Sequence, residues 1–195
     1  MATQLPVRRA STSTRAARPS YPDRWDLTHL VKGPSKEIDA ILSQLETVVA
    51  QIESARPTLT PSITGQDFQA LLTLSETFAQ GSSNLGAYAY LRFSENTKDA
   101  AARSLKARVE ERLTALSNRL LFFDLWWQSV DDTNAARLMA DAGDFRYHLE
   151  TIRRFKPHTL TEPEEKIVHL KNVTGRSAIH TFYDVVTNGL TFTLT

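Results

Sequence analysis

The chain has 195 residues, of which 41% are hydrophobic and 23% charged, and its formal net charge is +1 at neutral pH. This length and composition predict one globular domain, and the seven glycines argue against a turn-rich all-β fold. The absence of cysteine excludes disulfides, thiolate catalysis and sulfur-ligated metals, and it is compatible with the cytoplasmic location that we expect. No apolar run reaches the roughly 18 residues of a membrane span, which argues against a membrane partner.

Basic residues are concentrated at the N-terminus. Residues 1–22 contain Arg8, Arg9, Arg15 and Arg18 and no acidic residue. From Asp23 onward, 19 basic residues remain against 22 acidic ones, a net charge of about −3, which argues against nucleic acid as a partner. We expect residues 1–20 to form a disordered basic leader, with an organelle-targeting peptide as the alternative.

Hydrophobic periodicity predicts helices along most of the chain. After a leading loop at residues 21–34, apolar residues recur at steps of three and four, with an interruption around Gly81. The third helix, about 30 residues long, is longer than a small domain usually needs. Its segment Leu120–Trp127 is apolar on nearly every side, which predicts core packing or contact with another domain. The predicted helices span residues 35–55, 64–93, 97–131, 134–155, 161–171 and 176–187.

Local signals mark the C-terminal half. Gly143 is predicted to break or kink the fourth helix, and residues 172–175 are predicted as a second break. Thr161-Glu-Pro-Glu164 has the form of a capping box, in which Thr161 is the N-cap and Glu164 reaches back to its backbone N–H. Residues 190–195 alternate Leu, Phe and Leu with Thr, which is typical of a strand buried on one face.

This final strand has no other strand to pair with. Because a lone strand leaves its backbone donors and acceptors unpaired, we expect the chain to be a truncated part of a longer polypeptide. The predicted fold class is all-α, an elongated antiparallel helical lobe of about six helices that ends in one β-strand at the truncated C-terminus.

Sequence motifs assign no catalytic, cofactor-binding or metal-binding residue. There is no His-Glu-x-x-His array, which would set two imidazoles on one helix face beside a carboxylate. There is also no Gly-x-Ser-x-Gly elbow for a nucleophilic serine and no glycine-rich phosphate loop. The five histidines are His29, His148, His158, His169 and His180.

Four weaker candidates each have a structural interpretation that we favour. Glu165 and His169, four apart on one helix, could be half of a metal site or a solvated pair. His148 could be catalytic, although a buried or surface-paired histidine is more common. The basic cluster Arg153–His158 could bind a peptide carboxylate or place favourable charge at a helix C-terminus. Trp126-Trp127 could form a binding surface, with core packing or a domain contact favoured.

Two stretches resemble one peptidase family. Arg24-Trp-Asp-Leu-Thr-His-Leu30 resembles the sequence that precedes the first long helix in oligoendopeptidase F type zinc peptidases, relatives of thimet oligopeptidase. Residues 147–166, with Tyr, Leu-Glu, Arg, Lys-Pro-His and Glu-x-Glu-Glu in order, are similar to a second passage of that family. Residues 172–178 and 182–184, followed by the Thr-rich strand, continue the likeness. It covers residues 21–195 and is strongest from 145 onward.

The resemblance implies a much longer protein. In that family an elongated helical N-terminal lobe precedes a mostly helical catalytic domain that encloses a groove. The family also implies Zn²⁺ held by two His of a His-Glu-x-x-His helix and a downstream Glu, with the motif's Glu as general base. All of these residues would lie beyond Thr195, so we expect this chain to bind no zinc and to be inactive alone. Residues 21–175 would form the lobe and residues 176–195 the start of the truncated catalytic domain.

The expected function is therefore the substrate-enclosing N-terminal lobe of a zinc-dependent oligoendopeptidase that hydrolyses short peptides. Its Leu120–Trp127 patch is expected to contact the missing catalytic domain. The alternative is a free-standing helical protein-interaction module in which the same patch binds a partner.

Overall fold

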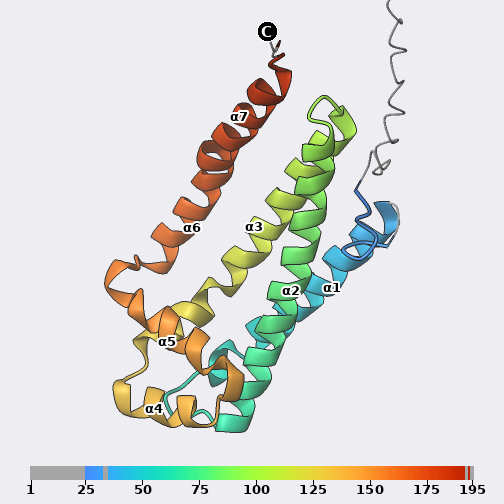
Figure 1. The fold of residues 1–195 in the computed structure, drawn as a ribbon. Coiled ribbons are helices and arrows are strands. Elements are labelled where there is room, and N and C mark those ends of the chain that lie inside the picture. Colours follow the sequence, from blue (N-terminus) through green and yellow to red (C-terminus); the bar gives the residue numbers. More distant parts are fainter. Residues whose placement is uncertain (1–24, 33–34, 192, 194–195) are drawn as a thin grey trace, which may run out of the picture.

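The computed structural model describes residues 25–32, 35–191 and 193, and over these residues the fold is all-α (Figure 1). Seven α-helices are described: the segment expected as one helix at 134–155 forms two, while a π-helical turn joins the two helices expected at 161–171 and 176–187. Within the described ranges no helix is both long and apolar enough to cross a membrane. The α-helices are α1 (Ser35–Ser54), α2 (Gly65–Glu95), α3 (Ala100–Ser129), α4 (Asp132–Ala140), α5 (Arg146–Arg154), α6 (Glu162–Asn172) and α7 (Ala178–Gly189), and the shorter turns are η1 (Arg56–Thr58), η2 (Gly143–Phe145), η3 (Lys156–His158) and the π-helical η4 (Val173–Ser177).

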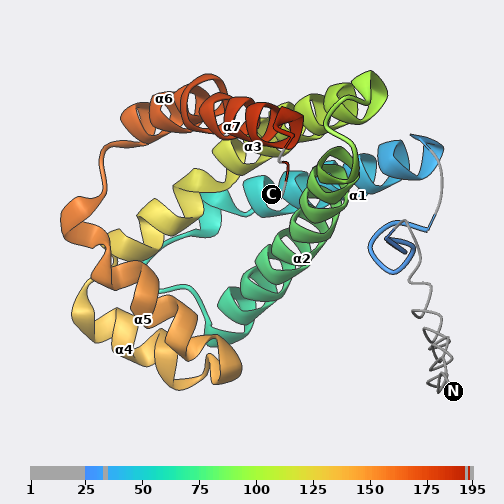
Figure 2. The same ribbon diagram turned by 45° about the horizontal axis from the view of Figure 1, so that its top comes forward.

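Helices α1, α2 and α3 form a bundle in which consecutive helices run in opposite directions (Figures 1 and 2). The apolar residues of α1 recur at three- and four-residue steps, so they share one face and are buried against α2 and α3. Side chains define where the next helices begin: Thr64 accepts the N–H of Asp67 at 3.1 Å, and Asp99 accepts that of Ala101 at 2.8 Å. The buried residues of α1 are Ile38, Leu42, Leu45, Val49 and Ile52.

The interruption predicted around Gly81 is wrong. Helix α2 continues unbroken through this position. A Cβ atom placed on Gly81 would lie 2.8 Å from Cδ2 of Leu45 in α1. Glycine is therefore used here for the close approach of two helices, and its cost to the helix is offset by packing. At Gly143, where φ is +55°, the chain does break between α4 and α5 as predicted.

The Leu120–Trp127 segment forms the second part of the hydrophobic core. Helices α4 and α5 pack around this end of α3, where Phe122, Phe123 and Trp127 are buried. The indole N–H of Trp127 donates to the carbonyl of Leu149 in α5 at 3.0 Å. Core packing, one of the two interpretations of this segment, is confirmed, because α2, α4 and α5 of the same chain cover its largest side chains; contact with a catalytic domain stays a prediction.

Helices α6 and α7 and the η4 turn form one continuous rod beside α3 (Figures 1 and 2). The break predicted at residues 172–175 is a π-helical turn, which widens the helix locally without ending it. None of the residues of this rod is buried. The rod is therefore attached along one side only.

The C-terminal strand predicted for residues 190–195 is not seen. Leu190, Thr191 and Thr193 have no strand structure, while residues 192, 194 and 195 lie outside the described residues. Helix α7 extends through Asn188 and Gly189, and no strand is present elsewhere in the described ranges to pair with this segment. The leader expected at residues 1–20 also lies outside the description.

Candidate functional site

The candidate site is the rod formed by α6, η4 and α7, together with the groove between this rod and the bundle. The rod begins at the predicted capping box, where the N–H of Thr161 donates to the Glu164 carboxylate at 3.0 Å. The hydroxyl and the N–H of Thr161 both donate to Glu164, which lowers the pKa of that carboxyl. A second acid of the first turn, Glu162, pairs with Arg56 at 2.9 Å and with Lys166 at 2.7 Å. These contacts fix the start of the rod against η1.

Polar contacts attach the rest of the rod to α3. The His169 ring Nδ1 lies 2.9 Å from Oδ1 of Asn118, a buried residue of α3. About three turns further along, Nζ of Lys106 in α3 donates to the Thr181 hydroxyl at 3.0 Å. These contacts between the rod and α3 are polar, in contrast to the apolar inner faces of α1 and α2.

The opposite side of the rod is apolar and exposed. We name the exposed residues on it the outer face; their exposed fractions run from 43% for Val186 to 70% for Phe182. An apolar surface of this extent on one helix is unusual for a free monomer and is typical of a contact site. The outer face consists of Ile167, Ile179, Phe182, Tyr183 and Val186.

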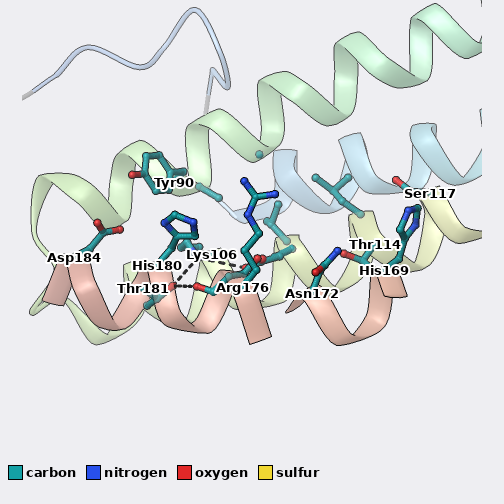
Figure 3. Close-up of a pocket in the computed structure, with 16 residues that line it drawn as sticks. Tyr90, Lys106, Thr114, Ser117, His169, Asn172, Arg176, His180, Thr181 and Asp184 are labelled. Carbon is teal, nitrogen blue, oxygen red and sulfur yellow. Dashed lines mark hydrogen bonds and ion pairs between the residues drawn. The ribbon is translucent and has the colours of Figure 1, made fainter. Parts of the chain in front are cut away.

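A groove of about 710 Å³ runs between the rod and helices α2 and α3 (Figure 3). This volume lies within the range of roughly 300–1,000 Å³ typical of ligand pockets. Its wall on the bundle side includes Ala89, Val109 and Leu113, and its wall on the rod side is polar. Figure 3 shows Arg176 and His180 projecting from the rod into this space.

Glu165 and His169, the proposed half of a metal site, have other partners. The Glu165 carboxylate accepts the N–H of Leu160 at 2.9 Å, and His169 is hydrogen-bonded to Asn118. In the part of the chain that the structure describes, no group of three or more His, Asp or Glu residues is arranged to hold a metal ion.

His148 lines a smaller recess between α2, α3 and α5, together with Asp124. Asp124 is exposed as a residue, but its carboxyl group is surrounded by enough protein atoms to lose part of its hydration. This burial raises the pKa of Asp124, and the nearby His148 opposes the shift in part. The recess brings one acid and one histidine together, but neither has a hydrogen bond to a described residue that would orient it for proton transfer.

Arg153, from the basic cluster 153–158, has a structural role. Its guanidinium donates to the carbonyls of Trp127 and Val130 at 3.0 and 2.8 Å, and it lies over the Trp127 ring. These carbonyls belong to the end of α3, where backbone acceptors lack helical partners. The guanidinium therefore caps α3 and binds α5 to it, which favours the helix-terminus interpretation over peptide binding. Phe155 and His158 of the same cluster are exposed.

The tryptophan pair is part of the core. Trp127 is fully buried and stacks against Phe68 with ring centroids 5.2 Å apart, while Trp126 packs edge-on against the same ring at 5.8 Å. Of the remaining histidines, His29 is exposed in the leading loop, and His180 lines the groove, as His169 does.

Sequence analysis missed the groove residues Arg176, Lys106 and Asp184. Arg176, His180 and Asp184 recur every four residues, a spacing that places them on one side of a helix. Such spacing is common on solvated helices. It indicates a binding groove only after the fold places Lys106 and Tyr90 opposite these three residues.

The C-terminal third of the chain, which contains the rod, is similar to a known family. The family model described as Oligopeptidase F matches residues 126–192, a segment that starts at the end of α3 and includes the whole rod. Residues 126–192 are similar to an oligopeptidase F N-terminal region. The predicted resemblance is thereby confirmed over this third of the chain, whereas its extension to residues 21–125 stays a prediction. No curated protein and no solved structure matches the chain.

An oligopeptidase F region implies a metallopeptidase relative. The residues that the structure describes contain no catalytic constellation and no metal-binding group, so the implied zinc has no ligand set among them.

Proposed function

We propose that this chain is the N-terminal, substrate-enclosing lobe of a zinc-dependent oligoendopeptidase and has no peptidase activity alone. The match of residues 126–192 to the oligopeptidase F model carries the proposal. In this proposal the lobe forms one wall of the substrate cleft of the complete enzyme. The cleft admits only short, unfolded peptides to the catalytic residues.

The outer face of the rod supports this role. Each apolar side chain exposed on it would gain about 25 cal/mol per Å² on burial. A helix that turns its polar side inward and its apolar side outward is expected to be covered in the working protein. We propose that the catalytic part of the enzyme covers the outer face around Phe182 and thereby takes the docking role first expected of the Leu120–Trp127 patch.

The zinc chemistry is assigned to residues outside this chain. A catalytic zinc ion needs three protein ligands in one place, with a fourth position for water. The described residues do not fit this requirement. In the complete enzyme, a His-Glu-x-x-His helix and a further acid would hold the metal, and no step of the reaction is assigned to a residue of this lobe.

The second candidate is a free-standing helical interaction module. The outer face would serve such a module equally well, because any partner with an apolar surface could cover it. The family match favours the peptidase lobe, since it includes the whole rod.

A peptidase assay with two polypeptides tests the proposal. The first is the 195-residue chain, and the second is the same chain extended along its reading frame through the first His-Glu-x-x-His motif and the acid after it. We expect the extended form to cleave a quenched fluorescent peptide and to lose activity with a chelator, while the short chain is inactive. Chelator-sensitive cleavage by the short chain would overturn the proposal, and a stop codon directly after Thr195 would favour the interaction module.

A pair of matched variants tests the role of the outer face in the extended protein. Phe182→Ser removes an aromatic ring that is 70% exposed on this face, and Tyr147→Ser removes a similarly exposed ring, at 71%, from α5. We expect the first change to lower thermal stability and activity and the second to leave both near the unchanged protein. Equal effects would show that the outer face has no special contact.

A further inference from the structure

The groove beside the rod contains a row of three polar residues that have no partners in the described structure. Arg176, His180 and Asp184 follow one another at four-residue steps and line the groove (Figure 3). No ion pair and no hydrogen bond joins any of these three side chains to another described residue. By contrast, Lys106 on the opposite wall is engaged, since its Nζ lies 3.3 Å from Glu110 and 3.0 Å from the Thr181 hydroxyl.

The charges of the groove are separated along its length. Glu110 balances Lys106 in the middle of the bundle-side wall. The remaining charges are the guanidinium of Arg176, which belongs to the η4 turn, and the carboxylate of Asp184, in the middle of α7. A ligand that fits both must carry a negative group at one end and a positive group at the other.

The spacing of these charges indicates the size of the ligand. Eight residues separate Arg176 from Asp184, which at about 1.5 Å per residue is about 12 Å along the rod. An extended peptide advances by about 3.3–3.6 Å per residue, so three or four residues reach from one charge to the other. The apolar wall formed by Ala89, Val109 and Leu113 can contact their side chains.

We propose that this groove binds a tri- or tetrapeptide with free termini, its C-terminal carboxylate on Arg176 and its N-terminal ammonium on Asp184. The guanidinium offers two parallel donors that match a carboxylate. His180 lies midway between the two charges and can hydrogen-bond the peptide backbone. Tyr90, from α2, lies above His180 on the opposite wall of the groove (Figure 3).

This inference rests on the proposed function only for the choice of a peptide as ligand. The groove lies within this chain, between the rod and the bundle, and is lined by none of the residues expected to hold zinc. Binding is measured on the 195-residue chain without turnover. Failure to bind would refute the groove and leave the peptidase proposal intact, whereas an inactive extended enzyme would leave the binding result unchanged.

Calorimetric titration of the purified chain with tetra-alanine tests the inference without any substitution. Three probes are compared: the free peptide, its C-terminal amide and its N-acetyl form. Because each cap removes one charge-assisted contact, we expect each to weaken binding by about tenfold. No binding of tetra-alanine, or equal binding of free and capped forms, would overturn the proposal.

Two variants then assign each end of the peptide. Arg176→Gln should weaken the binding of the free peptide by about tenfold and make the free peptide and the amide bind equally well. Asp184→Asn should likewise weaken the binding of the free peptide by about tenfold and make the free peptide and the N-acetyl form bind equally well. Arg154→Gln, which changes an arginine that is 67% exposed on α5, is the matched control and should bind like the unchanged chain. If the amide still binds more weakly than the free peptide to Arg176→Gln, the assigned orientation is wrong.

Discussion

Arg153→Met is expected to destabilise the chain strongly, although arginine is usually a surface residue. The Arg153 side chain is only 15% exposed, and its guanidinium caps the last carbonyls of α3. Methionine keeps the apolar stem of the arginine but removes every donor. The change therefore isolates the hydrogen bonds from the packing of the side chain.

The expected loss follows from the contacts of the guanidinium. Each hydrogen bond from a charged donor contributes about 1.5 kcal/mol or more, so the two bonds to the carbonyls of Trp127 and Val130 give about 3 kcal/mol. The ion pair with Asp132, whose side chain is fully exposed, adds little. The contact with the Trp127 ring is partly replaced by the methionine sulfur.

Urea unfolding followed by tryptophan fluorescence measures this loss. With an m-value of about 2 kcal/mol per M, a loss of about 3 kcal/mol lowers the midpoint by about 1.5 M. Arg154→Met is the matched control: this neighbouring arginine is 67% exposed and lies 4.0 Å from Glu150, so its change should stay within about 0.5 kcal/mol. Equal midpoints for the two variants would refute the capping role and reopen the interpretation of this cluster as a carboxylate site.

Three further predictions concern the recess, the start of the rod and its outer face. Because burial raises the pKa of Asp124, its charged form is disfavoured in the folded state; Asp124→Asn should raise the melting temperature at neutral pH, with the gain fading as pH falls to about 3.9, where the unfolded state is also protonated. A gain that persists at pH 3 would contradict this. Thr161→Ala should cost α6 about 1 kcal/mol and speed amide hydrogen exchange there about fivefold, with exchange in α1 unchanged. Phe182→Glu should reduce the binding of an apolar fluorescent dye to the chain while the urea midpoint stays within about 0.5 kcal/mol, and a large loss of stability would show that the ring is packed after all.

Elements with local causes could be predicted from the sequence. The stripe of α1, the length of α3 and the capping box at Thr161 and Glu164 depend on residues a few positions apart, and all three are present in the structure. The interruption expected around Gly81 was wrong, because the glycine leaves room for the side chain of Leu45 on another helix. No local sequence pattern reveals such a contact. The strand at residues 190–195 was predicted from a period-two pattern. A strand also needs a neighbouring strand to pair with, and the local sequence does not show whether one is present.

The orientation of the rod could not be predicted for a similar reason. Ile179, Phe182 and Val186 form the most apolar side of α7, and periodicity alone would place this side against the bundle. The structure turns it outward, because the contacts of the rod with α3 are polar and run through His169 and Thr181. The groove depends on this orientation, so its residues could not be identified from their spacing.

The π-helical η4 turn determines which side of α7 meets the bundle. Such a turn amounts to one residue inserted into a regular helix, and each residue of an α-helix contributes about 100° of rotation. Deletion of Thr174 would restore regular winding and rotate all of α7 about its own axis by that angle relative to α6. Phe182 and its neighbours would then leave their outward position, and Arg176 and Asp184 would no longer share one side with His169. The winding of a single turn thus determines the directions in which the apolar and the charged sides of α7 point.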